Sequence, residues 1–245
     1  MTTPRQLAGP ALPAAHPDNP CAQPAWGGST PDLFADLEAA AAEPFFFAPG
    51  AALLRGFALP YVTELLAALD EICALAPFRH MQTPGGHTMS AAMSNCGPLG
   101  WVSDLSGYRY ASADPQTGRP WPELPAAMTR LAGEAATAAG YTKFAPDACL
   151  INRYLPGAHL SLHQDRNERD FKQPIVSLSL GLPANFLWGG QRRKDAVCKL
   201  ALQHGDIVVW GGASRLNYHG VAALAPGQHA LLGGCRINLT LRKAG

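Results

Sequence analysis

The chain has 245 residues, of which 47% are hydrophobic and 15% are charged, and its formal net charge is +1. This length and composition fit one catalytic domain with enough apolar material for a core, and the near-neutral charge excludes a strongly basic nucleic-acid coat protein. With 25 glycines and 22 prolines, we expect many turns, which are typical of short strands rather than of a helical bundle.

The N-terminal segment, residues 1–30, is rich in Pro, Ala and Gly and lacks helical or strand periodicity. We expect a flexible extension there. Polar and charged residues interrupt its apolar stretches, so it lacks the continuous apolar region of a secretory signal peptide. No stretch of the chain approaches the roughly 18 apolar residues of a membrane-spanning helix. We therefore expect a cytoplasmic protein with no membrane partner.

The next part of the chain, residues 31–147, contains two predicted helices and a long segment rich in turns. Ordered structure is expected to begin near Pro31, and residues 51–57 predict a strand. Apolar residues recur at helical spacing over 60–74, and a second helix is expected over 125–140. The segment 80–125 is dense in Gly, Pro and aromatic residues, a pattern typical of lids and binding loops.

From residue 148 onward the pattern changes to strands. Residues 149–154 and 207–210 predict strands, and 175–182 alternates apolar residues with Ser177 and Ser179. The last run, 236–242, alternates Ile and Leu with Arg, Asn and Thr. A strand with this alternation buries its apolar side chains in a core and presents its polar side chains on the other face.

Three residues of this second half are candidates for a metal site. His163 and Asp165 form an H-x-D triplet, and two residues that are two apart in a strand point to the same side. His219 is the best candidate for a third ligand, although His159 and His204 compete with it. Two histidines and one carboxylate leave three octahedral positions open, which is the facial triad of non-haem Fe(II) oxygenases.

The polar face of the last strand predicts an anion-binding site. Arg236, Asn238 and Arg242 share that face by the two-residue period. If the face lines a cavity, a dicarboxylate would pair with both guanidinium groups. Asn152 and Tyr154, also two apart, could add hydrogen bonds from a neighbouring strand. The alternative is an exposed edge strand.

Several segments carry a more specific signal. They are Met81–Ser90, Asp114–Pro122, Asp147–Tyr154, Leu160–Asp165, Pro174–Pro183, His204–Gly212 and Cys235–Arg242. Together they resemble the bacterial AlkB family of alkylated-nucleobase repair dioxygenases. The resemblance covers roughly residues 31–243 and leaves the first thirty residues unexplained.

The resemblance implies an α+β, mainly β fold. Its core would be a double-stranded β-helix, or jelly roll, over residues 148–245. Flanking helices and a nucleotide-recognition lid would occupy residues 31–147, forming one functional unit with the core. Iron(II) would be bound by His163, Asp165 and His219. The cosubstrate 2-oxoglutarate would contact Asn152, Tyr154, Arg236, Asn238 and Arg242.

The resemblance also implies a reaction, the oxidative demethylation of 1-methyladenine- and 3-methylcytosine-type bases in single-stranded DNA or in RNA. The enzyme would consume 2-oxoglutarate and O₂ and release succinate and formaldehyde. We expect it to be a monomer. Asn167 stands where the family pattern has an Asp, and His87 replaces a lid Tyr, which leaves the lesion preference open. The expected substrate-binding residues are Trp101, Tyr108, Asn167, Arg193, His87 and Met89.

Two other functions are compatible with the same residues. A related oxygenase could act on etheno or neutral lesions, on tRNA or on protein, with the same iron and cosubstrate groups. A non-catalytic jelly-roll module would bind neither. A basic rim of Arg166, Arg169, Lys172 and residues 191–195 is expected to bind phosphates, and the alternative is an ordinary polar loop.

Overall fold

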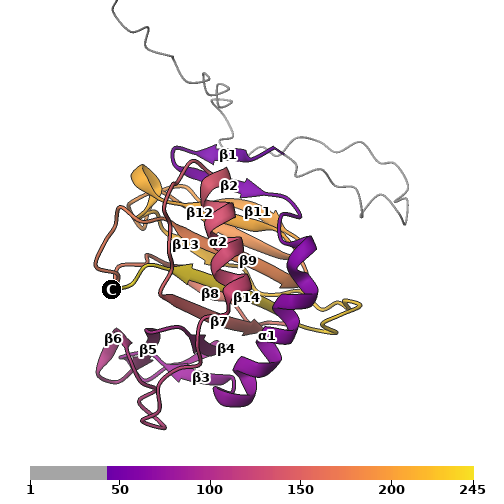
Figure 1. Ribbon diagram of the computed structural model, residues 1–245. Helices are drawn as coiled ribbons and strands as arrows, with labels where there is room; N and C mark the ends of the chain where they lie inside the picture. Colours follow the sequence, from indigo (N-terminus) through magenta and orange to yellow (C-terminus); the bar gives the residue numbers. More distant parts are fainter. Residues whose placement is uncertain (1–42) are drawn as a thin grey trace, which may run out of the picture.

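The computed structural model describes residues 43–245, so the expected extension over 1–30 and the expected start of order at Pro31 lie outside the described residues (Figure 1). Two α-helices and fourteen strands make up this part of the chain. In chain order they are β1 (Phe45–Ala48), β2 (Ala51–Leu54), α1 (Val62–Leu75), β3 (Arg79–Gln82), β4 (Thr88–Cys96), β5 (Gly100–Asp104), β6 (Gly107–Ala111), α2 (Ala126–Ala138), β7 (Ala148–Tyr154), β8 (Leu160–His163), β9 (Ile175–Gly181), β10 (Ala184–Trp188), β11 (Cys198–Leu202), β12 (Ile207–Trp210), β13 (His219–Val221) and β14 (Arg236–Arg242).

The strands form a large sheet, a smaller sheet and a separate hairpin. The large sheet has the order β1-β2-β12-β9-β14-β7-β4-β3, and the smaller one has the order β11-β10-β13-β8. Among residues 43–245, strands β5 and β6 pair only with each other. All pairings are antiparallel, and neighbours in the sheets are often distant in sequence. This arrangement confirms the predicted mainly β, jelly-roll fold.

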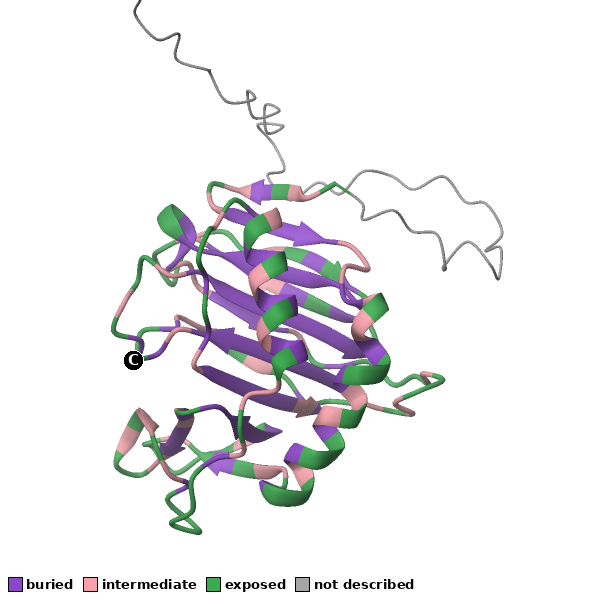
Figure 2. Ribbon diagram, in the orientation of Figure 1, coloured by how far each residue is buried: buried purple, intermediate pink, exposed green. Residues whose placement is uncertain are grey.

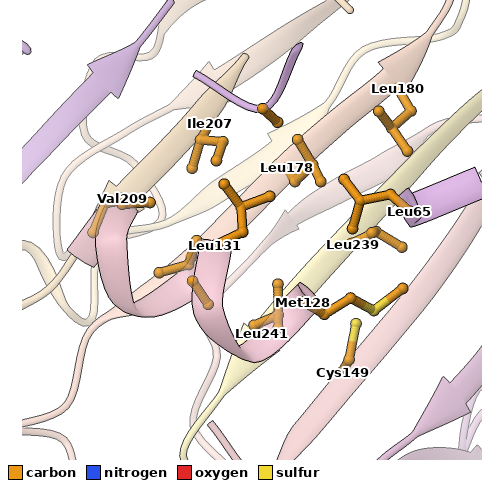
Figure 3. Close-up of a cluster of buried hydrophobic side chains, with 14 of the residues drawn as sticks. Leu65, Met128, Leu131, Cys149, Leu178, Leu180, Ile207, Val209, Leu239 and Leu241 are labelled. Carbon is orange, nitrogen blue, oxygen red and sulfur yellow. The ribbon is translucent and has the colours of Figure 1, made fainter. Parts of the chain in front are cut away.

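One face of the large sheet is covered by the two helices, which lie across it in Figure 1. Leu65 of α1 and Met128 and Leu131 of α2 pack against Leu178 and Leu239 of the sheet (Figure 3). Burying an aliphatic side chain of this size contributes about 1.5–3 kcal/mol. The amphipathic periodicity that predicts the helices therefore also determines which side of each helix faces the sheet.

The opposite face of the large sheet packs against the smaller sheet. Trp210 of β12 lies among Phe186 and Trp188 of β10 and Leu200 of β11. Because both faces are covered, the central strands β7, β9, β12 and β14 are buried along almost their whole length (Figure 2). Strand β14 alternates as predicted, with its apolar residues in the core beneath the helices and its polar residues on the other side.

The segment 80–125, expected to consist of long loops, instead contains most of β3 and all of β4, β5 and β6. Strand β4 has the sequence TMSAAMSNC, without β-branched residues except its first Thr, so it lacks an ordinary strand pattern. It is ordered because it pairs with β7. The large sheet therefore continues across the expected boundary at residues 147/148, and β1 to β4 extend it on both sides.

No helix among residues 43–245 is both long and apolar enough to cross a lipid bilayer.

Candidate active site

A cavity of about 630 Å³ opens beside the polar face of β14. Strands of the large sheet, strands of the smaller sheet and the β5–β6 hairpin all contribute to its wall. Every site residue predicted from the sequence lines it, so the structure brings the full set together. These residues are His163, Asp165, His219, Asn152, Tyr154, Arg236, Asn238, Arg242, Trp101, Tyr108, Asn167, Arg193, His87 and Met89.

The three predicted metal ligands form one cluster. His163 at the end of β8 and His219 at the start of β13 are register partners across the smaller sheet. Asp165 follows β8 by two residues, and its carboxylate oxygens lie 3.7 Å from His163 Nε2 and 3.8 Å from His219 Nε2. One ligand atom from each residue lies within 4.8 Å of the other two. The competing candidates His159 and His204 are not part of this cluster.

Both imidazole rings are held in the tautomer that binds metal through Nε2. His163 Nδ1 lies 2.8 Å from the Ser161 carbonyl oxygen, and His219 Nδ1 lies 3.0 Å from that of Asn217. A carbonyl oxygen only accepts, so each Nδ1 carries the proton and each Nε2 keeps a lone pair. Burial lowers the pKa of His219 to about 3, so its ring is neutral at pH 7 and ready to coordinate.

The carboxylate of Asp165 is buried and paired with Arg242. Arg242 Nε donates to Asp165 Oδ2 over 3.0 Å, and its terminal nitrogen lies 2.8 Å from the same oxygen. Burial acts to raise the pKa of Asp165, but Arg242 and the two histidine rings outweigh it and hold this pKa well below its usual range. The donor set is therefore two neutral imidazoles and one carboxylate, which fits Fe(II).

Deeper in the cavity, Arg236 has unsatisfied hydrogen-bonding capacity. It is 1% exposed, and one terminal nitrogen donates to Ser179 Oγ over 2.9 Å. Its Nε and Nη1 have no hydrogen-bond partner among the described residues. The same holds for the buried Tyr154 hydroxyl and the Asn152 amide oxygen. A buried guanidinium without a counter-ion is costly, and burial lowers the pKa of Arg236. A carboxylate bound against this fork would satisfy it, so the residues fit a dicarboxylate such as 2-oxoglutarate.

Asn238 also lines this part of the cavity, but its side chain is already bonded within the protein. Its amide nitrogen donates to Ser177 Oγ and to the Leu178 carbonyl, both over 2.8 Å. Its oxygen accepts from Thr240 Oγ1 over 2.9 Å. Both of its amide hydrogens thus have partners within the protein, while the buried donors of the cavity that have no partner among the described residues belong to Arg236, Tyr154 and Trp210.

The mouth of the cavity carries an aromatic pair. Trp101 of β5 and Tyr108 of β6 are stacked, with ring centroids 5.6 Å apart and planes inclined by 16°. Asn167 Oδ1 accepts from Trp101 Nε1 over 3.2 Å, and its amide nitrogen lies 3.5 Å from the Tyr108 carbonyl oxygen. Arg193 donates to the Leu162 carbonyl over 3.0 Å, next to His163 in sequence. Trp101 therefore stacks on Tyr108 in this structure, and Asn167 contacts the Trp101 indole and the Tyr108 backbone.

The expected basic rim is exposed. Arg166, Arg169 and Lys172 lie on the surface after Asp165, and so do residues 191–194. Within that second stretch, Arg192 is neutralised in part by Asp195, with 2.9 Å between Nε and the carboxylate. Of the rim cations, Arg166 and Arg193 line the cavity, where phosphate contacts would be needed.

Sequence reasoning did not identify four residues that contact or support the site. Trp210 packs on the His219 ring with centroids 4.8 Å apart. Glu168, Arg215 and Tyr110 form a hydrogen-bonded group behind the cavity wall. Trp210 lies on a predicted strand, so the strand pattern hints at its burial. The three polar residues come from distant segments, and no local pattern indicates that they meet.

Comparisons with known proteins agree with this geometry. The sequence profile of the 2OG-Fe(II) oxygenase superfamily matches residues 50–242. The Alpha-ketoglutarate-dependent dioxygenase AlkB of Escherichia coli is 55% identical over 214 residues, which cover 87% of this chain and 98% of that protein. A homologue from Caulobacter vibrioides is 48% identical over 184 residues, 75% of this chain and 80% of its own. The solved structure of OsALKBH1 has a TM-score of 0.73 at 26% identity, covering 82% of this chain and 99% of that one.

Proposed function

Because the chain belongs to the AlkB family of 2-oxoglutarate- and iron(II)-dependent dioxygenases, we propose that it demethylates N-alkylated bases of the 1-methyladenine and 3-methylcytosine type in single-stranded DNA, and in RNA of the same form. One observation carries the proposal. A two-histidine, one-carboxylate cluster, an unsatisfied buried arginine and a stacked aromatic pair all line one cavity.

Each part of the cavity has a distinct task in this reaction. His163, Asp165 and His219 would hold the iron. Arg236 and Tyr154 would bind the distal carboxylate of 2-oxoglutarate, and Arg242 would lie near its metal-binding end. When bound, iron and 2-oxoglutarate supply with O₂ the oxidant that hydroxylates the N-methyl group, which then leaves as formaldehyde. The protein orders these groups and places the methyl carbon beside the metal.

The hairpin and the rim would recognise the nucleic acid. A target base inside a duplex cannot reach the metal cluster, so it has to leave the stack. Trp101 and the His219 ring offer aromatic faces that compensate for the lost base stacking. His87 and Met89 lie in the same wall, and Arg193 lies near the opening. A single strand is the preferred substrate because its bases are already unpaired.

A second candidate substrate class is favoured by Asn167. Its oxygen already accepts a hydrogen bond from Trp101, and an amide carries no negative charge. It therefore provides no ion pair for a cationic methylated base. Neutral lesions, including etheno adducts, fit such a pocket as well as cationic ones do.

The exposed apolar side chains of residues 43–245 support a monomer. The large ones, such as Phe46, Leu75, Leu155 and Leu231, lie on different segments of the chain. Apolar residues that are exposed singly need no partner to cover them. We accordingly propose that one copy of the chain forms the complete active site.

A panel of oligonucleotides tests this proposal. Single strands carrying 1-methyladenine, 3-methylcytosine or an ethenoadenine, each also in duplex form, are incubated with Fe(II) and 2-oxoglutarate and weighed by mass spectrometry. We expect the methylated single strands to lose the mass of one CH₂ unit, because a hydrogen replaces the methyl group, and to react faster than their duplexes. Unaltered masses for every oligonucleotide, with 2-oxoglutarate still consumed, would contradict the proposal.

A further inference from the structure

A buried polar group of Tyr110, Glu168 and Arg215 lies behind the wall of the cavity, and Glu168 Oε1 lies 3.7 Å from Nε of Arg242, a residue of the proposed cosubstrate site. Arg215 is 3% exposed, and its Nη2 lies 3.0 Å from Glu168 Oε2. The other oxygen of the same carboxylate accepts from the Tyr110 hydroxyl over 2.6 Å. Both oxygens of Glu168 are thus occupied. None of the three residues lines the cavity, so none of them has a direct part in the reaction proposed above.

One end of this group holds the segments that carry the iron ligands. Arg215 Nη1 donates to the backbone carbonyl of Asp165 over 2.9 Å, and its Nε donates to that of Gln173 over 3.1 Å. Arg215 itself precedes His219 by four residues. A single guanidinium therefore ties the loop that begins at Asp165 to the segment that leads into His219, and all three of its nitrogens are used.

The other end holds the hairpin. Tyr110 lies opposite Trp101 in the β5–β6 register, and Tyr108 precedes it by two residues. By the two-residue period of a strand, the three aromatic side chains project from the same face. Tyr110 is bonded to Glu168, while Trp101 is bonded to the neighbouring Asn167. The aromatic face is thus bonded to Asn167 and Glu168, which follow Asp165 by two and three positions.

The hairpin requires such anchors. Strands β5 and β6 pair with no other strand among the described residues, and an isolated two-stranded hairpin is at best marginally stable in water. The Asn95 side chain holds β5 through the backbone of Trp101, with contacts of 2.9 and 3.0 Å. On β6, the Ala111 carbonyl accepts from Trp121 Nε1 over 3.0 Å at the end of the strand, and the Tyr110 hydroxyl makes a buried side-chain contact two residues from Tyr108. Losing the Tyr110 contact would loosen the part of β6 that carries Tyr108.

We propose that Tyr110, Glu168 and Arg215 are positioning residues that fix the aromatic face of the hairpin relative to the iron ligands. These three residues connect the surface on which a base stacks to the ligands beside which its methyl group is oxidised. They form the rigid frame that fixes the position of one relative to the other. Replacing a buried ion pair by apolar residues of similar volume often leaves stability unchanged, so stability alone does not account for this group. The substrate in this inference is the one proposed above, so that part rests on the proposed function. The connection between the hairpin and the iron ligands rests on the geometry alone.

The test compares Tyr110→Phe with Tyr61→Phe. Both variants remove only a hydroxyl that donates to a glutamate, and Tyr61, bonded to Glu134, does not line the cavity. For Tyr110→Phe we expect about a tenfold higher KM for a methylated oligonucleotide, as for one lost hydrogen bond to a charged group. Formaldehyde formed per succinate should fall severalfold, while succinate formed without oligonucleotide stays unchanged. In Tyr61→Phe, the KM for the oligonucleotide, the formaldehyde formed per succinate and the succinate formed without oligonucleotide should all stay at their wild-type values.

Two results would overturn the inference. One is a Tyr110→Phe variant that matches Tyr61→Phe in KM and in formaldehyde per succinate. The other is an equal fall of succinate and formaldehyde, because that describes general damage rather than loss of position. A double-mutant cycle with Glu168→Gln adds a further criterion: the two substitutions should be non-additive, and additivity would equally contradict a shared frame.

Hydrogen exchange separates this inference from the proposed function. In Tyr110→Phe the amides of residues 107–111 should exchange about tenfold faster, while those of β13 keep their wild-type rates. This measurement needs no substrate. If the wild-type protein released no formaldehyde, the proposed function would fail, and the exchange rates would still decide whether the Tyr110 hydroxyl holds the hairpin. Unchanged exchange in residues 107–111 would show that it does not.

Discussion

The interior of the jelly roll and the β5–β6 hairpin contribute to the same cavity in opposite ways. In the interior, Arg236 is 1% exposed and Arg242 is 5% exposed, on a strand that is paired on both sides. On the hairpin, Tyr108 is 45% exposed, and the two strands pair with no further strand in the part of the chain that the structure describes. The groups proposed for the chemistry are thus embedded in the core, whereas those proposed for recognition are attached to it by a few side-chain contacts.

This difference indicates in which region a substitution would alter the reaction itself and in which it would alter the choice of substrate. A buried strand with cavity-facing arginines tolerates few substitutions, since an uncompensated buried charge is strongly destabilising. A hairpin with exposed side chains can vary without disturbing the core. Substitutions in the interior should therefore affect the reaction with every substrate, while substitutions on the hairpin should affect which substrate reacts. The predictions that follow test this division.

The largest effect is expected for His163→Ala. Removing one of three metal ligands should lower Fe(II) affinity and succinate formation by more than about a hundredfold, since loss of an outer hydrogen-bond partner alone costs 10- to 100-fold. The matched control is His159→Ala, which alters a histidine in the same cavity wall but outside the cluster. Iron binding measured by titration, together with succinate formation, distinguishes them. Equal losses in both variants would contradict the assignment of the ligands.

Arg236→Ala should raise the KM for 2-oxoglutarate by roughly a hundredfold, because two charge-assisted hydrogen bonds to a carboxylate are lost. The KM for the oligonucleotide should change little. Arg153→Ala is a suitable control, since Arg153 lies on the neighbouring strand and stacks on Phe78 with 4.7 Å to the ring centroid. An unchanged 2-oxoglutarate requirement in Arg236→Ala would rule out its role as the carboxylate partner.

Trp101→Ala addresses the recognition side. Loss of one base-stacking surface should raise the KM for a methylated single strand by about tenfold. Succinate formed in the absence of oligonucleotide should stay at the wild-type rate, which serves as the internal control. If both quantities fell together, the hairpin would be required for the chemistry itself, and the division between the two regions would be wrong.

The smallest effect is expected for Asn167→Asp. A carboxylate at this exposed position should favour a cationic base over a neutral one by about threefold, as for a solvent-screened ion pair. The ratio of rates on 1-methyladenine and ethenoadenine oligonucleotides measures this preference. Asn185→Asp introduces the same charge at an exposed position of β10 and should leave the ratio unchanged. No shift in Asn167→Asp would show that residue 167 does not read the charge of the base.

The sequence predicts the interior better than the hairpin, and the reason is physical. In β14 the apolar and polar residues alternate because each set faces a different environment, so the two faces can be read directly from the order of residues. Strands β4 to β6 carry Gly, small and polar residues, and their structure depends on pairing with distant partners. Glu168 and Arg215 lie 47 residues apart, and no local pattern indicates their contact.

The central claim is that the interior oxidises a methyl group that the hairpin presents. Its most direct test is the ratio of formaldehyde to succinate that the wild-type protein forms on a single-stranded oligonucleotide with 3-methylcytosine, compared with the same strand unmethylated. We predict a ratio near one for the methylated strand and no formaldehyde for the other. Succinate formation at the same rate with both strands, without formaldehyde, would contradict the account.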